Sequence, residues 1–182
     1  MAVQNNKDNL GTGIIDFSLK GIDDKFYSPA DFKDKDILVI IFKCNHCPYV
    51  KAVIDRLVSL QKKYEDKSVQ LIGINPNDSD SYPEDSFENM KLFAEKYKIN
   101  FPYLVDETQE IAKKYDAVCT PDIYVYYRER KLRYRGRLDD SWKDESKIMQ
   151  KDLEKAIELL LQGKEIDFQQ IPSIGCSIKW KV

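Results

Sequence analysis

The sequence predicts an α/β protein in which a central mixed sheet is flanked by helices. Residues 37–42 and 69–74 are mostly apolar, which is typical of central strands that are covered on both faces. After each of these segments, apolar residues recur at helical spacing. The order is strand, helix, strand, helix, strand, helix, then two strands and a helix. This order predicts parallel crossovers that end in a closing hairpin.

The individual elements follow from local patterns. Residues 17–20 and 25–27 flank a turn and predict a small N-terminal hairpin. Residues 28–32 predict a short helical turn with Ser28 as its cap and Pro29 at its first position. Apolar periodicity and turn residues predict the rest: strands at 37–42, 69–74 and 101–105, helices from near Val50 to Tyr64, at 87–97 and at 108–115, an antiparallel pair at 123–127 and 132–137, and a last helix whose apolar stripe runs from Met149 to Leu160 and ends before Gly163.

The organisation of the chain is expected to be simple. Its 182 residues suit a single domain over residues 1–182, and no repeat or linker divides them. Residues 1–13 are polar and are expected to be loosely held. Residues 171–180 are apolar enough to predict that the tail docks on the body.

Composition excludes several classes of function. A net charge of −2 gives no bulk field that would attract nucleic acid or a membrane surface, so we expect neither as a partner. The first residues lack the apolar segment of a secretory signal, and no apolar run has the length of a membrane span. We therefore expect a cytoplasmic protein, in which four cysteines indicate redox chemistry or metal binding rather than structural disulfides. The single histidine, His46, excludes sites that need two histidines.

Cys44 and Cys47 are the most informative residues. Two residues separate them, and they lie between a predicted buried strand and a predicted helix. The N-terminus of a helix stabilises an anion, so a thiol placed there loses its proton more easily and becomes a nucleophile. The pair predicts thiol–disulfide exchange. Cys44, expected to be exposed and to have the lower pKa, attacks a disulfide, and Cys47 resolves the mixed disulfide.

Four segments carry a resemblance to a known family. They are Cys44-Asn45-His46-Cys47-Pro48, Cys119-Thr120-Pro121-Asp122, residues 134–140 and the tail 172–181. Together they resemble the thioredoxin superfamily, and most closely its small peroxiredoxin-like redoxins of the AhpC/TSA type. The resemblance covers nearly the whole chain. It implies a thioredoxin-like fold with an N-terminal hairpin extension and a docked C-terminal tail.

The resemblance also implies how the site works. Pro121, after Thr120, corresponds to a cis proline that lies across from the cysteine pair, and the backbone there docks an extended substrate. Substrates would be protein or small-molecule disulfides, a dithiol protein would restore the enzyme, and no bound cofactor is required.

The chain departs from the family pattern at three places. Lys43 stands where thioredoxins have tryptophan, and no acidic residue follows Cys47 closely. If Cys47 is placed at the peroxidatic position of peroxiredoxins, Cys44 occupies the place of their threonine or serine. A thiol peroxidase, with Cys47 oxidised by peroxide and Cys44 resolving, is therefore the alternative to disulfide exchange. An alternative of another class is a redox sensor or a zinc module that uses all four cysteines, but with one short-spaced pair we expect no metal.

Other residues have two open interpretations each. His46 either favours the Cys44 thiolate by its positive charge, and so sets the redox poise, or is a loop residue facing solvent. Cys119 lies beside the pair or is a buried small hydrophobe, and Cys176 packs or forms a second thiol pair with Cys119. Arg135 and Arg137 either point at the thiols or belong to a solvated basic face.

Overall fold

A computed structural model describes residues 1–4 and 8–182. Seven of the described strands form one mixed sheet in the order β3-β2-β6-β5-β4-β8-β9. β4 lies parallel to β5 and antiparallel to β8, so the predicted mixed sheet is confirmed. The strands are β2 (Leu19–Gly21), β3 (Phe26–Tyr27), β4 (Ile37–Phe42), β5 (Val69–Asn75), β6 (Tyr103–Val105), β8 (Asp122–Tyr126) and β9 (Leu132–Arg135).

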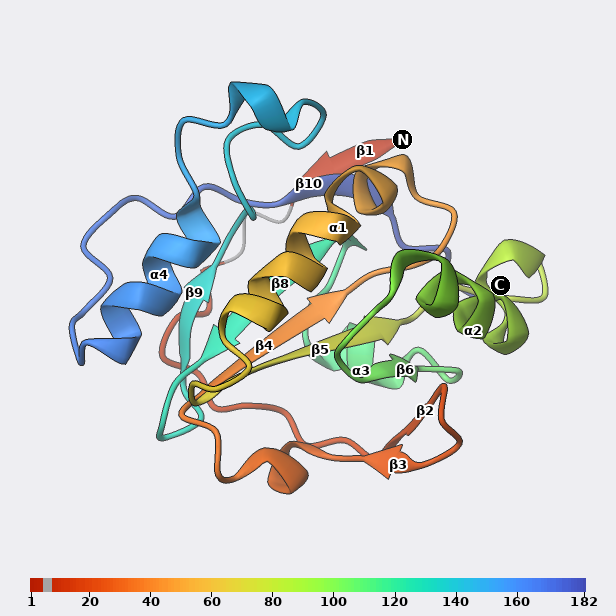
Figure 1. Cartoon of the computed structure of the whole chain (residues 1–182). Helices are drawn as coiled ribbons and strands as arrows, with labels where there is room; N and C mark the ends of the chain where they lie inside the picture. Colours follow the sequence, from red (N-terminus) through yellow and green to blue (C-terminus); the bar gives the residue numbers. More distant parts are fainter. Residues whose placement is uncertain (5–7) are drawn as a thin grey trace.

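Helices cover both faces of this sheet. They are α1 (Pro48–Lys63), α2 (Phe87–Tyr97), α3 (Glu110–Lys114) and α4 (Asp152–Leu161). Alternate residues of β4 explain the arrangement: Val39 packs in one core with α1, α2 and α4, and Ile40 packs in a second core with α3. Figure 1 shows α1 lying across one face of the sheet. In the described part of the chain, none of the helices combines the length and the apolarity that crossing a membrane requires.

Local signals are confirmed at most of the predicted boundaries. Ser28 caps the turn Pro29–Phe32, and its N–H donates to Asp31 Oδ2 at 2.7 Å. Gly163 follows α4 with a φ of +70°, as expected of a C-cap.

The start of α4 is the exception. α4 begins at Asp152, and Met149 is 86% exposed, so its predicted place in the apolar stripe is wrong. The N–H of Met149 donates to Asp140 Oδ1, which holds this residue in a loop rather than in the helix.

A second, smaller sheet joins distant parts of the chain. Its strands are β1 (Ala2–Gln4), β10 (Ile174–Ser177) and β7 (Cys119–Thr120), and β10 lies antiparallel between the other two. The docked tail is thereby confirmed. Residues 2–4 pair with the tail, residues 5–7 lie outside the described residues, and the loosely held N-terminus stays a prediction. Figure 1 shows β1 and β10 side by side near the first turn of α1.

Candidate active site

The loop between β4 and α1 carries the two cysteines. α1 begins at Pro48, two residues before the predicted start, which makes Cys47 its N-cap residue. Both Cys44 and Cys47 are fully buried, with 0% of their surface exposed. The prediction that Cys44 is an exposed thiol is therefore wrong. Cys176 of the tail packs against the apolar cluster that contains both thiols.

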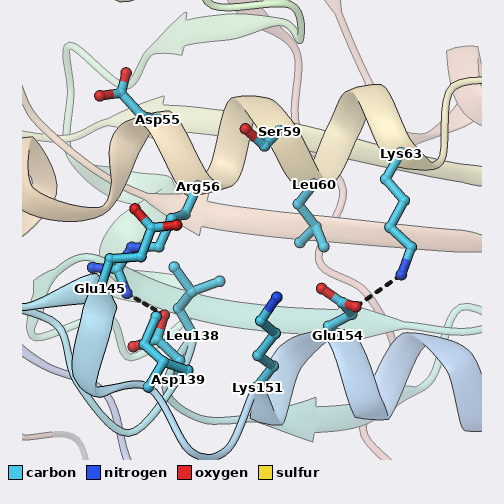
Figure 2. Close-up of a pocket in the computed structure, with 11 residues that line it drawn as sticks. Asp55, Arg56, Ser59, Leu60, Lys63, Leu138, Asp139, Glu145, Lys151 and Glu154 are labelled. Atoms are coloured by element: carbon cyan, nitrogen blue, oxygen red, sulfur yellow. Dashed lines mark hydrogen bonds and ion pairs between the residues drawn. The ribbon is translucent and has the colours of Figure 1, made fainter.

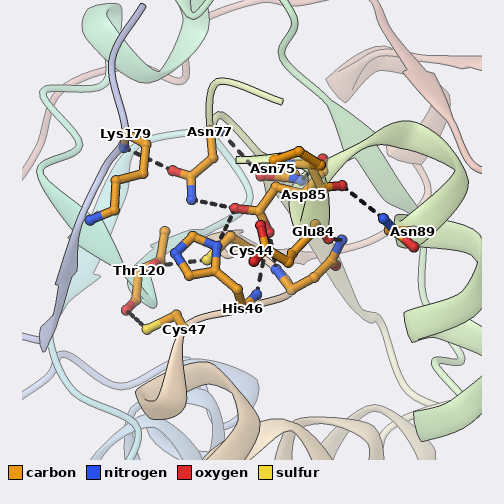
Figure 3. A network of polar contacts seen from close by, with 12 residues as sticks. Cys44, His46, Cys47, Asn75, Asn77, Glu84, Asp85, Asn89, Thr120 and Lys179 are labelled. Carbon is orange, nitrogen blue, oxygen red and sulfur yellow. Dashed lines mark hydrogen bonds and ion pairs between the residues drawn. The ribbon is translucent and has the colours of Figure 1, made fainter. Parts of the chain in front are cut away.

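Both active-site sulfurs contact Thr120. The bond between Thr120 and Pro121 is cis, as the family resemblance implies. The Cys44 Sγ lies 3.4 Å from the Thr120 hydroxyl, and the Cys47 thiol donates to the Thr120 carbonyl at 3.1 Å. Figure 3 shows Thr120 joined to both sulfurs. The Thr120-Pro121 segment thus lies directly against the cysteine pair.

The two thiols have opposite electrostatic surroundings. A hydrogen bond from the Cys44 thiol lowers the pKa of Cys47 to about 4, against the effect of burial, and the Cys176 thiol and the Val50 N–H contribute in the same direction. The same bond to Cys47, together with burial, raises the pKa of Cys44 well above its usual value. The thiol with the lower pKa is therefore Cys47, and the assignment of that property to Cys44 is wrong. The main reason is the contact between the two sulfurs, and the Val50 N–H at the start of α1 adds to it.

A buried carboxylate, that of Asp85, organises the loop. Its Oδ1 accepts the backbone N–H groups of Asn45 at 2.7 Å and His46 at 3.3 Å. Its Oδ2 lies 2.6 Å from His46 Nδ1 and accepts from Asn77 Nδ2 at 2.7 Å. Figure 3 shows these contacts converging on Asp85. The carboxylate therefore fixes both the backbone between the cysteines and the orientation of the imidazole.

His46 faces its partner Asp85 rather than open solvent. Its ring also stacks on Tyr82, with centroids 5.5 Å apart and planes 6° apart. The negative charge of Asp85 is one cause of the raised pKa of Cys44. A protonated His46 would neutralise that charge, so the role of His46 in setting the redox poise stays a prediction, now with a named partner.

Replacement of His46 by alanine tests this role. Without the imidazole, the Asp85 carboxylate keeps an uncompensated charge that disfavours a thiolate, so we expect the protein to become more reducing. A shift on the order of 30 mV corresponds to ~1.4 kcal/mol for this two-electron couple. The reduction potential is measured by equilibration with glutathione, with Tyr82→Leu as the control that removes only the stacking partner. An unchanged potential in His46→Ala would contradict the role.

Lys43 lies buried next to Cys44. Its side chain is fully covered, and in the described part of the chain its Nζ has no hydrogen-bond partner. The Nζ lies 3.1 Å from the centroid of the Tyr103 ring and 4.6 Å from that of Phe93. Burial lowers the pKa of Lys43 well below its usual value. The position that departs from the thioredoxin pattern is thus a buried amine surrounded by aromatic rings.

Sequence reasoning missed Asp85 and Asn77. Both lie in or after a segment that we interpreted only as a turn-rich loop. Asn77 follows the carboxyl end of β5, and polar residues at that edge of a parallel sheet commonly form sites. That rule was a usable signal for Asn77, whereas nothing local distinguishes Asp85.

Both arginines contact polar side chains. Arg135 donates to the Tyr124 hydroxyl at 2.6 Å and lies 3.6 Å from Asp122. Arg137 donates to Asp152 at 2.5 Å. Both guanidinium groups thus have polar partners, and a role of either arginine at the cysteine pair stays a prediction.

The four cysteines do not form one zinc site. Cys119 is buried, its thiol donates to the Pro121 carbonyl at 3.5 Å, and burial raises its pKa. Of the described residues, the group that brings potential metal ligands within 4.8 Å of one another is Cys44, His46 and Asp85. The Asp85 oxygens already accept hydrogen bonds from three neighbouring residues, so this group is a hydrogen-bond network rather than a preformed metal site.

The described surface has one hollow beside the cis proline and another between α1 and α4. One of about 120 Å³ adjoins Pro121 and is lined by Tyr49 and Trp142, whose ring centroids are 4.0 Å apart. A larger hollow of about 490 Å³ lies between α1 and α4 (Figure 2). Charged side chains, among them Arg56 and Lys63, line the larger hollow and form ion pairs across it. The smaller hollow is the one that adjoins the cis proline.

Comparisons with known proteins give a consistent result. Residues 10–135 match the AhpC/TSA family. Peroxiredoxin Q from Populus jackii is 28% identical over 109 residues, which are 60% of this chain and 47% of that protein. The thioredoxin-like protein YneN from Bacillus subtilis is 29% identical over 110 residues, 60% of this chain and 61% of that protein. The chain thus spans about half to three fifths of the length of these two relatives.

Solved structures agree over more of the chain. An uncharacterized conserved protein from Geobacillus kaustophilus is 47% identical, with a TM-score of 0.94 over 100% of this chain and 97% of that one. A hypothetical protein from Sinorhizobium meliloti is 37% identical, with a TM-score of 0.94 over 98% of both chains. A putative thiol:disulfide interchange protein DsbE from Chlorobium tepidum, 15% identical, shares the fold with a TM-score of 0.65 over 85% of this chain and 96% of that one. The predicted thioredoxin-like fold is confirmed.

Proposed function

The chain belongs to the AhpC/TSA family, and from this premise we propose that it is a thiol–disulfide oxidoreductase in which Cys47 attacks a disulfide and Cys44 resolves the product. Members of this group are redoxins, so oxidoreductase chemistry follows from the family. The geometry of the cysteine pair supports these roles of Cys47 and Cys44. Two adjacent thiols contact Thr120, and the one at the helix N-cap has the lowered pKa.

The reaction proceeds in two exchanges. The Cys47 thiolate attacks one sulfur of the substrate disulfide, and the other substrate sulfur leaves as a thiolate. Cys44 then attacks the Cys47 sulfur, its proton passes to the departing thiolate, and the second half of the substrate is released. The raised pKa of Cys44 keeps its thiol protonated while the Cys47 thiolate lies beside it. Formation of the mixed disulfide on Cys47 removes that negative charge. A dithiol protein reduces the Cys44–Cys47 disulfide, and we place this cycle in a reducing compartment such as the cytoplasm.

Peroxide reduction is the second candidate function. The position of Cys47 favours this reaction. Cys47 lies at the start of a helix, and Cys44, three residues earlier, contacts its sulfur. The arginines that could assist are paired elsewhere, and Cys44 replaces a hydroxyl. We therefore propose that peroxide turnover is weak compared with disulfide exchange.

Trapping experiments test the roles of the two cysteines. Because Cys176 adjoins Cys47, each variant also carries Cys176→Ser, so that only the pair is tested. We expect Cys44→Ser to accumulate a mixed disulfide with oxidised glutathione on Cys47, and Cys47→Ser to accumulate none, as read by intact mass. Cys119→Ser is the matched control and should exchange at the normal rate. Adduct formation on Cys44 in the Cys47→Ser protein would reverse the roles, and peroxide consumption faster than insulin reduction would favour a peroxidase.

A further inference from the structure

The tail strand lies on the edge that an extended substrate would use. β10 pairs antiparallel with β7, so that Cys176 lies opposite Thr120 and Ser177 opposite Cys119. Thr120 is the residue that precedes the cis proline and contacts both active thiols. A free strand edge at this place would accept an extended peptide by backbone pairing. The chain's own segment takes that place.

Gly175 lets the tail approach this edge very closely. A Cβ at position 175 would lie 2.1 Å from the Thr120 carbonyl oxygen and 3.1 Å from the Pro121 nitrogen. Such contacts involve backbone atoms that cannot move aside, so only glycine fits here. The tail is therefore built to dock directly against the cis peptide.

Hydrogen bonds of the Lys179 backbone anchor the chain just after β10. The N–H of Lys179 donates to Asn77 Oδ1 at 3.0 Å, and the Lys179 carbonyl accepts from Asp78 N–H at 2.9 Å. Figure 3 shows Lys179 attached to the network that contains Asn77 and Asp85. The covering strand is thus tied to the same network that orients the cysteine loop.

Cys176 is aligned with the active thiols. Residues directly opposite each other in an antiparallel pair point to the same face, so Cys176 and Thr120 share a face of the small sheet. Cys176 packs against the apolar cluster that contains Cys47, and its thiol lowers the pKa of Cys47. Cys44 and Cys47 are fully buried, whereas Cys176 keeps partial exposure. Cys119, paired with Ser177, points to the other face.

We propose that β10 is an internal substrate strand, which occupies the docking edge of β7 and presents Cys176 as the disulfide partner of Cys47. The inference rests on the proposed function. Once a substrate has left Cys44 and Cys47 as a disulfide, the Cys176 thiolate attacks the Cys47 sulfur. The Cys47–Cys176 bond forms, the Cys44–Cys47 bond breaks, and Cys44 leaves as a thiolate that takes up the proton released by Cys176. No net oxidation occurs, and the disulfide moves to a partly exposed residue where a dithiol reductant can reach it.

The same geometry defines the class of substrate. A protein substrate must displace β10 and pair with Thr120 in its place. In that register, the residue before the substrate cysteine meets the cis peptide as Gly175 does, so the site selects an extended segment with glycine before its cysteine.

Disulfide mapping tests the transfer. Cys44→Ser and Cys44→Ser/Cys176→Ser are treated with oxidised glutathione and analysed by peptide mass spectrometry. We expect the single variant to expel glutathione and form a Cys47–Cys176 disulfide, and the double variant to retain glutathione on Cys47. Stable glutathione adducts on Cys47 in both proteins would overturn the inference and leave the proposed function intact. Absence of any adduct on Cys47 in either protein would overturn both.

Gly175→Ala tests the docking of the strand independently. The added methyl group should displace β10 and raise the rate of Cys47 alkylation by iodoacetamide on the order of tenfold, equivalent to ~1.4 kcal/mol in the opening equilibrium. Gly13→Ala is the matched control, because its Cβ would meet nothing within 4 Å. An alkylation rate equal to that of the control would overturn the inference. If Gly175→Ala unfolds, a synthetic peptide with Ile-Gly-Cys-Ser should be oxidised faster by the disulfide form of the parent protein than one with Ile-Val-Cys-Ser, and equal rates would contradict the inference.

Discussion

Asp85→Ala is expected to lower the free energy of unfolding by ~3–5 kcal/mol, because it leaves several hydrogen-bond donors of the loop without their buried acceptor. The carboxylate is 1% exposed and accepts from Asn45, His46 and Asn77. The alanine side chain replaces none of these contacts. The loop between the cysteines loses its anchor at the same time, so disulfide exchange should fall together with stability.

The matched variant Asp85→Asn separates charge from geometry. Its amide oxygen can still accept the backbone N–H groups of Asn45 and His46, so the loop keeps its conformation. Loss of the negative charge should lower the pKa of Cys44, since that charge is one of the causes that raise it. Urea unfolding measures the stability of both variants, and the pH dependence of Cys44 alkylation in a Cys47→Ser background measures the pKa. Equal stabilities for Asp85→Ala and the parent protein would show that the network is dispensable.

Lys43→Met is expected to act in the opposite direction and stabilise the protein at neutral pH. The folded-state pKa of Lys43 is lowered by burial, whereas the unfolded chain binds a proton up to about pH 10.4. Above that pH the amine is neutral in both states, so its protonation no longer changes the stability. As the pH falls, only the unfolded chain takes up the proton, so the parent protein loses about 1.4 kcal/mol per pH unit until the folded-state pKa is reached. Methionine fills similar space and has no such loss.

The measurement compares the two proteins across pH. The difference in the free energy of unfolding between Lys43→Met and the parent should be largest near pH 7 and should shrink toward pH 9.5. Lys51→Met, at an exposed position of α1, is the control and should show a small difference that does not depend on pH. A Lys43→Met protein less stable than the parent at pH 7 would mean that the amine's contacts with Tyr103 and Phe93 outweigh its burial.

Sequence patterns were sufficient for the large elements of the fold. β4 occupies the predicted residues 37–42, and α1 and α4 bury the apolar stripes beginning at Val50 and Leu153. These predictions succeed because the apolar pattern follows the burial: β4 is apolar throughout and covered on both faces, and each of the two helices buries one apolar stripe. The small sheet was not predicted, because β1, β7 and β10 have two to four residues each and form strands only by pairing with distant parts of the chain.

The site was predictable in its members but not in its electrostatics. The Cys-x-x-Cys spacing identified both thiols, and Thr120-Pro121 was found through the family resemblance. Which thiol has the lower pKa depends on the contact between the two sulfurs and on the thiol of Cys176, and the local sequence shows neither. Asp85 could not be found, because its contacts with Asn45 and His46 span about forty residues of sequence.

The pairing of β10 with β7 also imposes an order of events on synthesis. Cys44, Cys47 and Thr120 are all translated before Cys176, which follows Thr120 by 56 residues. At translation rates of roughly 5–20 residues per second, that interval lasts ~3–11 s. During it, the nascent chain already contains its reactive thiols but not yet the strand that covers them. A newly made molecule thus passes through a short period in which cellular thiols and disulfides compete for a sulfur that the finished protein keeps covered.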